Sequence, residues 1–364
     1  MKRGHRPDYF LIVLVFLLTV AGLIILSSAS SDLGKLKFND SYYYLKHQVT
    51  YGLFVGLVGF LIALYVPYRH YRKIALPLLI VSVITLVLVF TPLGLEVRNT
   101  NRWLALGPLS FQPAEPLKLA YLLYVAAWLS NAKANRETSL FEGFIPFLLV
   151  SGLIAILLLM QPATSTVVIL LGSGMIVYFL SGARLKYLLT MAAIGVVGIG
   201  LVIYFTPYRL QRLLTYVNSQ NDAQGSGYHI NQALIAIGSG GLWGVGYGQS
   251  AAKVNYLPAP IDDSIFAVAA EEFGFVGASI IVMLFALLTL RLLWLARSTR
   301  DRFGKLLLFG FAAVIAFQSL VNMAAISGLF PLTGVPLPFV SYGGTALAVF
   351  LTMMGIATNV SKYS

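Results

Sequence analysis

The feature that most constrains this chain is a series of ten long apolar runs. Each spans about 17 residues or more, close to the ~20 residues that an α-helix needs to cross the hydrocarbon core of a bilayer. Charged residues make up only 10% of the chain, against roughly 25% in soluble domains. We therefore expect an all-α, polytopic membrane protein of about ten transmembrane helices, forming one integral membrane domain over residues 1–364. The runs cover residues 9–28, 48–66, 75–92, 113–131, 143–160, 163–181, 187–206, 265–290, 305–327 and 342–361.

Two of these runs carry further information about topology. The first is longer than the apolar part of a cleaved signal peptide and lacks a small-residue cleavage site, so we expect a retained helix. The fifth and sixth are separated only by Gln161 and Pro162, which predicts a tight helical hairpin.

Lysine and arginine are unevenly distributed over the segments between the runs. With ten spans both termini lie on one side, and that side carries about twice as many lysines and arginines as the other. Positive charge marks the cytoplasmic side, so we expect cytoplasmic termini and a multi-pass protein of the plasma membrane. The net charge of +12 then reflects orientation and contact with anionic lipid headgroups, not a nucleic-acid partner.

The segments on the outer side are the longer ones, and they are the candidates for function. They cover residues 29–47, 93–112 and 207–264, and the last lies between helices seven and eight. A long structured loop in a compact protein is usually functional. The third segment begins with "PYRLQRLLTYVN", whose leucines recur at helical spacing while Arg209 and Arg212 take another face. We expect a helix on the membrane surface that is either a lipid anchor or a binder of an anionic headgroup.

A glycine-rich stretch, "AIGSGGLWGVGYGQS" at 236–250, follows in the same segment. It is no dinucleotide fingerprint, since neither a strand nor a βαβ unit surrounds it. Two interpretations stay open: a flexible loop, or a backbone cradle for phosphate or sugar.

Four of the 13 acidic residues gather at the end of this segment: Asp262, Asp263, Glu271 and Glu272. An aspartate just before a helix is a good N-cap, but one cap does not explain two aspartates. Adjacent carboxylates oppose each other's ionisation, so one of them should hold its proton more tightly, as a general base near neutral pH requires. An acid within an apolar helix, as Glu271 or Glu272 would be, is a functional candidate by default.

Further polar residues lie at the outer ends of other runs. Glu115 and Lys118 are three residues apart and share one helix face. They form either a structural ion pair or the lining of a water-filled cavity. Arg102 and Trp103 lie just upstream and are candidates to bound the same polar site. Near the end of the chain, "NMAAISGLFPLTGVPLPFVSYGG" predicts a proline-rich re-entrant segment. Its polar residues are Asn322, Ser341 and Tyr342.

Some classes of site are excluded. The chain has no cysteine, so it has no disulfide, thiolate metal site or cysteine nucleophile. The histidines lie far apart in the sequence and form no HxxH or HExxH pattern, which argues against a histidine metal site. They are His5, His47, His70 and His229.

Taken together, these segments resemble the SEDS family of bacterial cell-wall glycosyltransferases, and within it the branch that acts in cell elongation. The resemblance rests on motifs spread in order over more than half of the chain. They are "NRWL" at 101–104, "QPAEPLK" at 112–118, "AIGSGGLWGVGYGQS" at 236–250, "KVNYLPAPIDDSIFAVAAEEFGFVG" at 253–277 and "PLTGVPLPFVSYGG" at 331–344.

The resemblance implies a function and its residues. Such proteins polymerise lipid II on the outer face of the plasma membrane, beside a class B penicillin-binding protein that crosslinks the glycan. It places the essential acid at Asp263 and matches Glu115 and Lys118 to the family's acid and base in the fourth span. The chain departs from the family pattern at Ala114 (usually serine), in "QPATST" at 161–166, which lacks the usual acid, and at Ile261 and Asp262.

The chemistry needs a base, cations and a substrate site. Asp263 is the candidate base for the attacking sugar hydroxyl, and cations must stabilise the leaving pyrophosphate. A divalent cation, Mg²⁺ or Mn²⁺, is a further possibility; no organic cofactor is expected. A flippase or transporter for a lipid-linked sugar is the alternative, although no internal repeat supports it. We count as substrate-binding candidates Arg102, Trp103, Lys253, Asp262, Arg209, Arg212, Ser341 and Tyr342.

Overall fold

A computed structural model gives the fold for residues 6–97, 100–106, 109–131, 136–217, 227–254 and 256–363. Each of the ten apolar runs forms a helix or a continuous helical segment. The helices that correspond to the runs are α1 (Tyr9–Phe38), α2 (Tyr43–His47) continuing through η1 (Gln48–Phe54) into α3 (Val55–Tyr65), α4 (Arg69–Leu88), α5 (Ala114–Leu129), η3 (Leu140–Phe144) with α6 (Ile145–Met160), α7 (Thr164–Leu180), α8 (Leu185–Tyr204), α11 (Ile265–Ser298), α12 (Arg302–Ile326) and α13 (Gly344–Ser361).

Within the described residues, eight helical segments are long and apolar enough to cross a membrane. The other two predicted spans form α7, which has 17 residues, and α5, which has 16 and carries Glu115 and Lys118 near its start. The chain is therefore a membrane protein with a mostly helical fold, as the sequence predicts.

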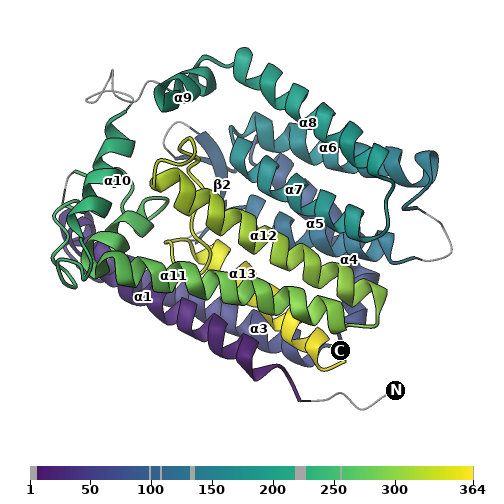
Figure 1. Ribbon diagram of the computed structural model, residues 1–364, viewed down its shortest axis with the longest axis horizontal. Helices are drawn as coiled ribbons and strands as arrows, with labels where there is room; N and C mark the ends of the chain where they lie inside the picture. The colour runs from purple at the N-terminus through teal and green to yellow at the C-terminus, as the bar shows by residue number, and fades with distance from the viewer. Residues whose placement is uncertain are drawn as a thin grey trace.

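The helices lie side by side in one bundle, with both termini at the same end (Figure 1). Helices α12 and α13 form its centre: 78% of the apolar window of each is buried, against 17% for α8. Tyr121 of α5, Phe311 of α12 and Phe350 of α13 are fully buried, and the hydroxyl of Tyr121 lies 2.8 Å from that of Ser151 in α6. The central helices thus offer rigid, enclosed surfaces for polar side chains.

The hairpin between α6 and α7 is as tight as the sequence predicts, since only residues 161–163 join the two helices. The buried amide of Gln161 donates to the carbonyl oxygen of Leu86 in α4 over 3.0 Å. This bond fixes the tip of the hairpin against a neighbouring helix.

The outer segment 93–112, expected to be a loop, contains a small antiparallel sheet that the all-α prediction did not include. Its strands are β1 (Gly94–Val97), β2 (Thr100–Leu106) and β3 (Leu109–Phe111), in the order β1-β2-β3. Leu104 is buried and its neighbour Trp103 pairs with Leu95. Successive residues of a strand face opposite sides, so the sheet turns one face to the helices.

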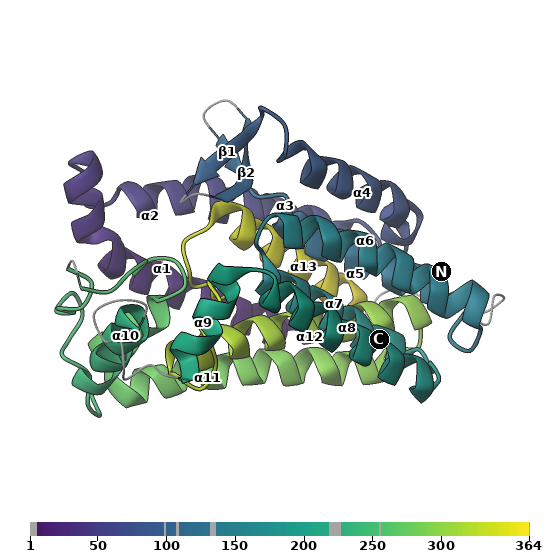
Figure 2. The ribbon, with the colours of Figure 1, turned by 90° about the horizontal axis from the view of Figure 1, so that it is seen from above.

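Where the structure describes it, the long segment 207–264 forms the helices α9 (Pro207–Val217) and α10 (Tyr228–Ser239). Helix α9 is the predicted amphipathic surface helix. Helix α10 packs against α11, at the end of the bundle away from the termini (Figures 1 and 2).

The glycine-rich segment packs against a break in α11, where Gly274 has a φ of 64°. A Cβ atom on Gly244, whose φ is 83°, would lie 2.1 Å from the carbonyl oxygen of Glu272. The amides of Val245 and Gly246 donate to the carbonyl oxygens of Glu271 and Glu272. Because the chain itself uses these amides, this part of the segment is not a phosphate cradle.

Candidate functional site

The turn that carries Asp262 and Asp263 comes immediately before α11. Ser264 occupies the N-cap position, and its side chain makes no capping hydrogen bond. Neither aspartate is therefore the N-cap residue, which removes the simplest structural explanation for the pair. Both side chains are half-buried.

Three successive carbonyl groups of this turn are held by the C-terminal part of the chain. The amide of Tyr342 donates to Ile261 over 2.9 Å, and the hydroxyl of Ser341 donates to Asp262. The side-chain amide of Asn322 donates to the carbonyl oxygen of Asp263 over 2.8 Å. The backbone beneath both carboxylates is thereby fixed.

The carboxylate of Asp263 faces the proline-rich segment 331–338. A Cβ atom on Gly334 would lie 3.8 Å from Oδ2 of Asp263, so glycine leaves open space beside this oxygen. Gly334 also lines a cavity of about 300 Å³. Gly334 therefore lies between this cavity and the turn that carries Asp262 and Asp263, which we call the acidic turn.

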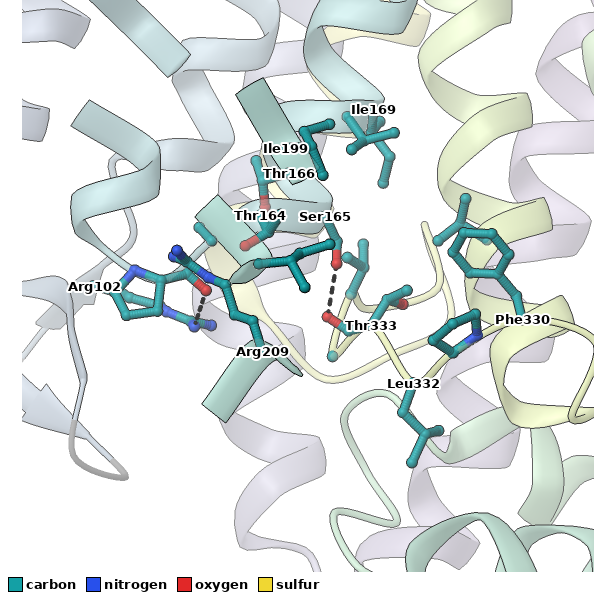
Figure 3. A pocket seen from close by; sticks show the side chains of 18 residues that line it. Arg102, Thr164, Ser165, Thr166, Ile169, Ile199, Arg209, Phe330, Leu332 and Thr333 are labelled. Carbon is teal, nitrogen blue, oxygen red and sulfur yellow. Dashed lines mark hydrogen bonds between the residues drawn. The ribbon is translucent and has the colours of Figure 1, made fainter. Parts of the chain in front are cut away.

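Two arginines lie on one side of this cavity, which we call the arginine cavity (Figure 3). Arg102 of β2 donates to the carbonyl oxygens of Gln161 and Pro162 over 2.9 and 2.8 Å. Arg209 of α9 donates to the carbonyl oxygen of Leu159 over 2.9 Å. Burial lowers the pKa of Arg209, but a guanidinium stays protonated in proteins. The site is thus positively charged.

The remaining lining of the arginine cavity is mostly apolar, and it includes the first turn of α7. The N-terminal end of a helix favours negative charge, and this one lies beside the two arginines. The hydroxyl of Ser165 donates to the carbonyl oxygen of Thr333 over 3.1 Å, which ties α7 to the proline-rich segment. The apolar walls come from Ile169, Ile199, Ile203, Val321 and Phe330.

Glu115 and Lys118 form a fully enclosed ion pair rather than part of the arginine cavity. Nζ of Lys118 lies 2.8 and 3.0 Å from the two carboxylate oxygens of Glu115, and both residues are at most 3% exposed. Lys118 also donates to Oε1 of Gln318 over 2.8 Å. The amide of Gln318 in turn donates to the carbonyl oxygen of Pro336 over 2.9 Å. The pair therefore braces the proline-rich segment from inside the bundle.

The second pair of acids, Glu271 and Glu272, makes buried contacts with residues 248–253. Glu271 accepts from the hydroxyl of Ser250 and the amide of Ala251. Glu272 pairs with Nζ of Lys253 over 3.1 Å, and this lysine also donates to Ser28 of α1. These buried contacts hold residues 248–253 onto α11 and α1, away from the arginine cavity.

Of the other predicted site residues, Trp103 lies near the arginine cavity and two more contact the acidic turn. Trp103 lies next to Arg102 in β2 and is half-buried. Ser341 and Tyr342 fasten the acidic turn, and the hydroxyl of Tyr342 lies 3.0 Å from Nδ1 of His47. The side chain of Arg212 lies outside the described part of the structure.

Sequence reasoning missed three polar residues that support the site. Gln318 links Lys118 to the proline-rich segment. Gln48 accepts from the amide of Gly343 over 2.9 Å, and His229 lies 2.7 Å from the hydroxyl of Ser264. Gln48 and Gln318 are polar residues within apolar runs, and this was the signal available for them.

The sequence matches a family model described as "cell cycle protein", which covers FtsW, RodA and SpoVE, over residues 8–364. Stage V sporulation protein E of Bacillus subtilis is 36% identical over 359 residues, covering 98% of each chain. A probable peptidoglycan glycosyltransferase FtsW of Trichlorobacter lovleyi is 37% identical over 355 residues, covering 97% of this chain and 93% of that protein.

Solved structures share the fold. The rod shape determining protein RodA of Thermus thermophilus is 28% identical, with a TM-score of 0.71, and the match covers 98% of this chain and 96% of that one. A chain from a structure described as structural coordination of polymerization and crosslinking by a peptidoglycan synthase complex has a TM-score of 0.81 at 28% identity. That match covers 98% of this chain and 99% of the other.

Proposed function

The chain belongs to the FtsW, RodA and SpoVE family of cell cycle proteins, and we propose that it is a peptidoglycan glycosyltransferase that polymerises lipid II. The observation that carries this proposal is the position of the Asp263 carboxylate beside a cavity with two arginines and apolar walls. A carboxylate, cations and an apolar surface are the groups needed to join lipid-linked sugars. The names of the relatives support the same activity.

Asp263 is the proposed general base. The 4-hydroxyl of the acceptor sugar loses its proton to the carboxylate as its oxygen attacks the anomeric carbon of the donor. A base that is positioned and partly desolvated contributes ~10²–10⁴-fold to such a step. Asp262 is adjacent, and its negative charge favours the protonated form of its neighbour.

Arg102 and Arg209 are the proposed binding site for the pyrophosphate of the donor. The bond from the anomeric carbon to the pyrophosphate breaks as the new glycosidic bond forms, and negative charge collects on the leaving phosphate. Fixed cations in a partly desolvated site stabilise such charge. The apolar walls of the arginine cavity fit the polyprenyl chain next to that pyrophosphate.

Orientation follows from the charge distribution. We propose that both termini are cytoplasmic and that the acidic turn faces the outer side of the plasma membrane, because lysine and arginine are enriched at the end of the bundle that carries the termini. Thiol labelling of single cysteines placed at Tyr256 and at Tyr363 in whole cells would test this: only the first should react with an impermeant reagent.

A class B penicillin-binding protein is the proposed partner. One structural neighbour comes from a peptidoglycan synthase complex that polymerises and crosslinks, and this chain shares its fold. An elongation role is likewise a proposal, since the relatives include rod shape, sporulation and FtsW proteins. Depletion of the protein should give round cells if it acts in elongation and filaments if it acts in division.

A divalent cation would need ligands from the substrate. Among the described residues, no group of three or more histidine, aspartate or glutamate side chains could hold a metal ion. Asp262 and Asp263 are the residues that would hold Mg²⁺ or Mn²⁺, and a bound cation would neutralise negative charge on the leaving pyrophosphate. Chelation should then abolish polymerisation, and added Mg²⁺ or Mn²⁺ should restore it.

The direct test is whether the purified protein in lipid vesicles converts lipid II into glycan polymer. Polymer from the wild-type protein, with little from Asp263→Asn, is the expected result. Movement of lipid II between the leaflets without any polymer would instead support a transporter.

A further inference from the structure

We propose that Asn322 is a positioning residue for Asp263. Its buried side-chain amide binds the backbone of the turn that carries Asp263 and the backbone of the proline-rich segment that this carboxylate faces. The inference rests on the proposed function of Asp263 and adds to it a residue that sets the direction of this carboxylate. Asn322 lies in α12, one of the two central helices.

The side chain of Asn322 donates hydrogen bonds to two different backbone segments. Its Nδ2 atom donates to the carbonyl oxygen of Asp263 over 2.8 Å and to that of Val335 over 2.7 Å. An amide nitrogen has two protons, and both are used. Val335 follows Gly334, the residue that the Asp263 carboxylate faces. One side chain therefore holds the acidic turn and the proline-rich segment at a fixed separation.

Gln318 repeats this arrangement one helical turn away. Residues four apart lie on the same helix face, and Gln318 donates to Pro336 while accepting from Lys118. The two amides of α12 thus bind successive carbonyl groups, those of Val335 and Pro336. This face of α12 is a rigid polar strip between the Glu115–Lys118 pair and the Asp263 turn.

A purely structural role explains Asn322 poorly. The residue is 1% exposed, yet its Oδ1 atom has no hydrogen-bond partner among the described residues. A buried polar atom without a partner destabilises the fold, and the two bonds that the amide nitrogen donates offset that cost.

Ser319, the neighbour of Gln318 on α12, is the matched control. It is also buried, but its hydroxyl donates to the carbonyl oxygens of Ile315 and Ala316 in its own helix. Replacing it removes a buried polar group from the same helix without touching the acidic turn.

The first experiment compares Asn322→Leu with Ser319→Ala in purified protein, measuring kcat, KM for lipid II and thermal stability. Misplacing a catalytic group by ~1 Å can cost ~10²-fold in rate. We expect Asn322→Leu to lower kcat about 10- to 100-fold with KM within about threefold, because Asn322 does not line the arginine cavity. Ser319→Ala should stay within about twofold of wild type. Equal kcat in the two variants would overturn the proposal.

The second experiment combines Asn322→Leu with Asp263→Glu, which keeps a carboxylate but displaces it. If Asn322 acts through Asp263, its substitution should cost far less in this background than in the wild type. Equal losses in both backgrounds would contradict positioning. If Asn322→Leu does not accumulate in the membrane, Asn322→Ala enters the same cycle. A wild-type rate from Asp263→Asn would refute the proposed base itself, an outcome separate from the Asn322 comparison.

Discussion

Arg102 and Arg209 lie in different outer segments, yet both guanidinium groups donate to backbone carbonyls of the same hairpin between α6 and α7. The hairpin tip is itself fastened to α4 through Gln161. Two cations are thereby set at one side of a cavity before any ligand arrives. Such preorganisation avoids reorganisation when negative charge develops.

This arrangement predicts that each arginine contributes to turnover of a pyrophosphate-linked donor. Arg102→Gln and Arg209→Gln should each lower kcat/KM for lipid II about 10- to 100-fold, since a hydrogen bond to a charged group is worth ~1.5–3 kcal/mol. Arg184→Gln, an exposed arginine at the far end of α8, is the control and should be unaffected. Kinetics of the purified variants would check this, and wild-type values would remove the arginine cavity from the site.

Substitutions in the Glu115–Lys118 pair can distinguish a role in stability from a role in polymerisation. Lys118→Met leaves a buried carboxylate without its cation, a change that typically costs ~3–5 kcal/mol. We expect a lower melting temperature and little polymerisation. Adding Glu115→Gln should recover much of the stability while polymerisation stays low, because Gln318 still lacks its donor. If activity returned together with stability, the pair would be structural only.

Gly244 tests the packing of the glycine-rich segment. Alanine there would adopt a left-handed backbone conformation and place its Cβ against the carbonyl oxygen of Glu272. Strain of this kind costs ~1–3 kcal/mol, so Gly244→Ala should lower thermal stability. Gly195→Ala in α8, where a Cβ would meet nothing within 4 Å, should not. Equal melting temperatures for the two variants would mean that the glycine-rich segment does not pack against α11.

Much of the fold can be predicted from the sequence, because hydropathy and helix length are local properties. The ten runs, the α6–α7 hairpin and the amphipathic helix α9 all follow from periodicity over a few turns. The β1-β2-β3 sheet was not predicted, because its strands are short and its register depends on pairing between segments.

The candidate site residues could be selected from the sequence, but their contacts could not. Paired carboxylates in an apolar chain drew attention to Asp262 and Asp263, and motif resemblance selected Asp263. No local pattern indicates that Asn322 reaches the carbonyl of Asp263, or that Lys253 pairs with Glu272. These contacts depend on how distant helices pack.

The most direct measurement is polymerisation of lipid II by purified Asp263→Asn, with thermal stability recorded alongside. Asparagine keeps the size of the side chain and the carbonyl that Asn322 holds, but it cannot accept the proton, so turnover should fall by ~10²–10⁴-fold with little change in melting temperature. Asp262→Asn should lose less. Wild-type polymer from Asp263→Asn would contradict the assignment, and a dead Asp262→Asn beside an active Asp263→Asn would move the base by one residue.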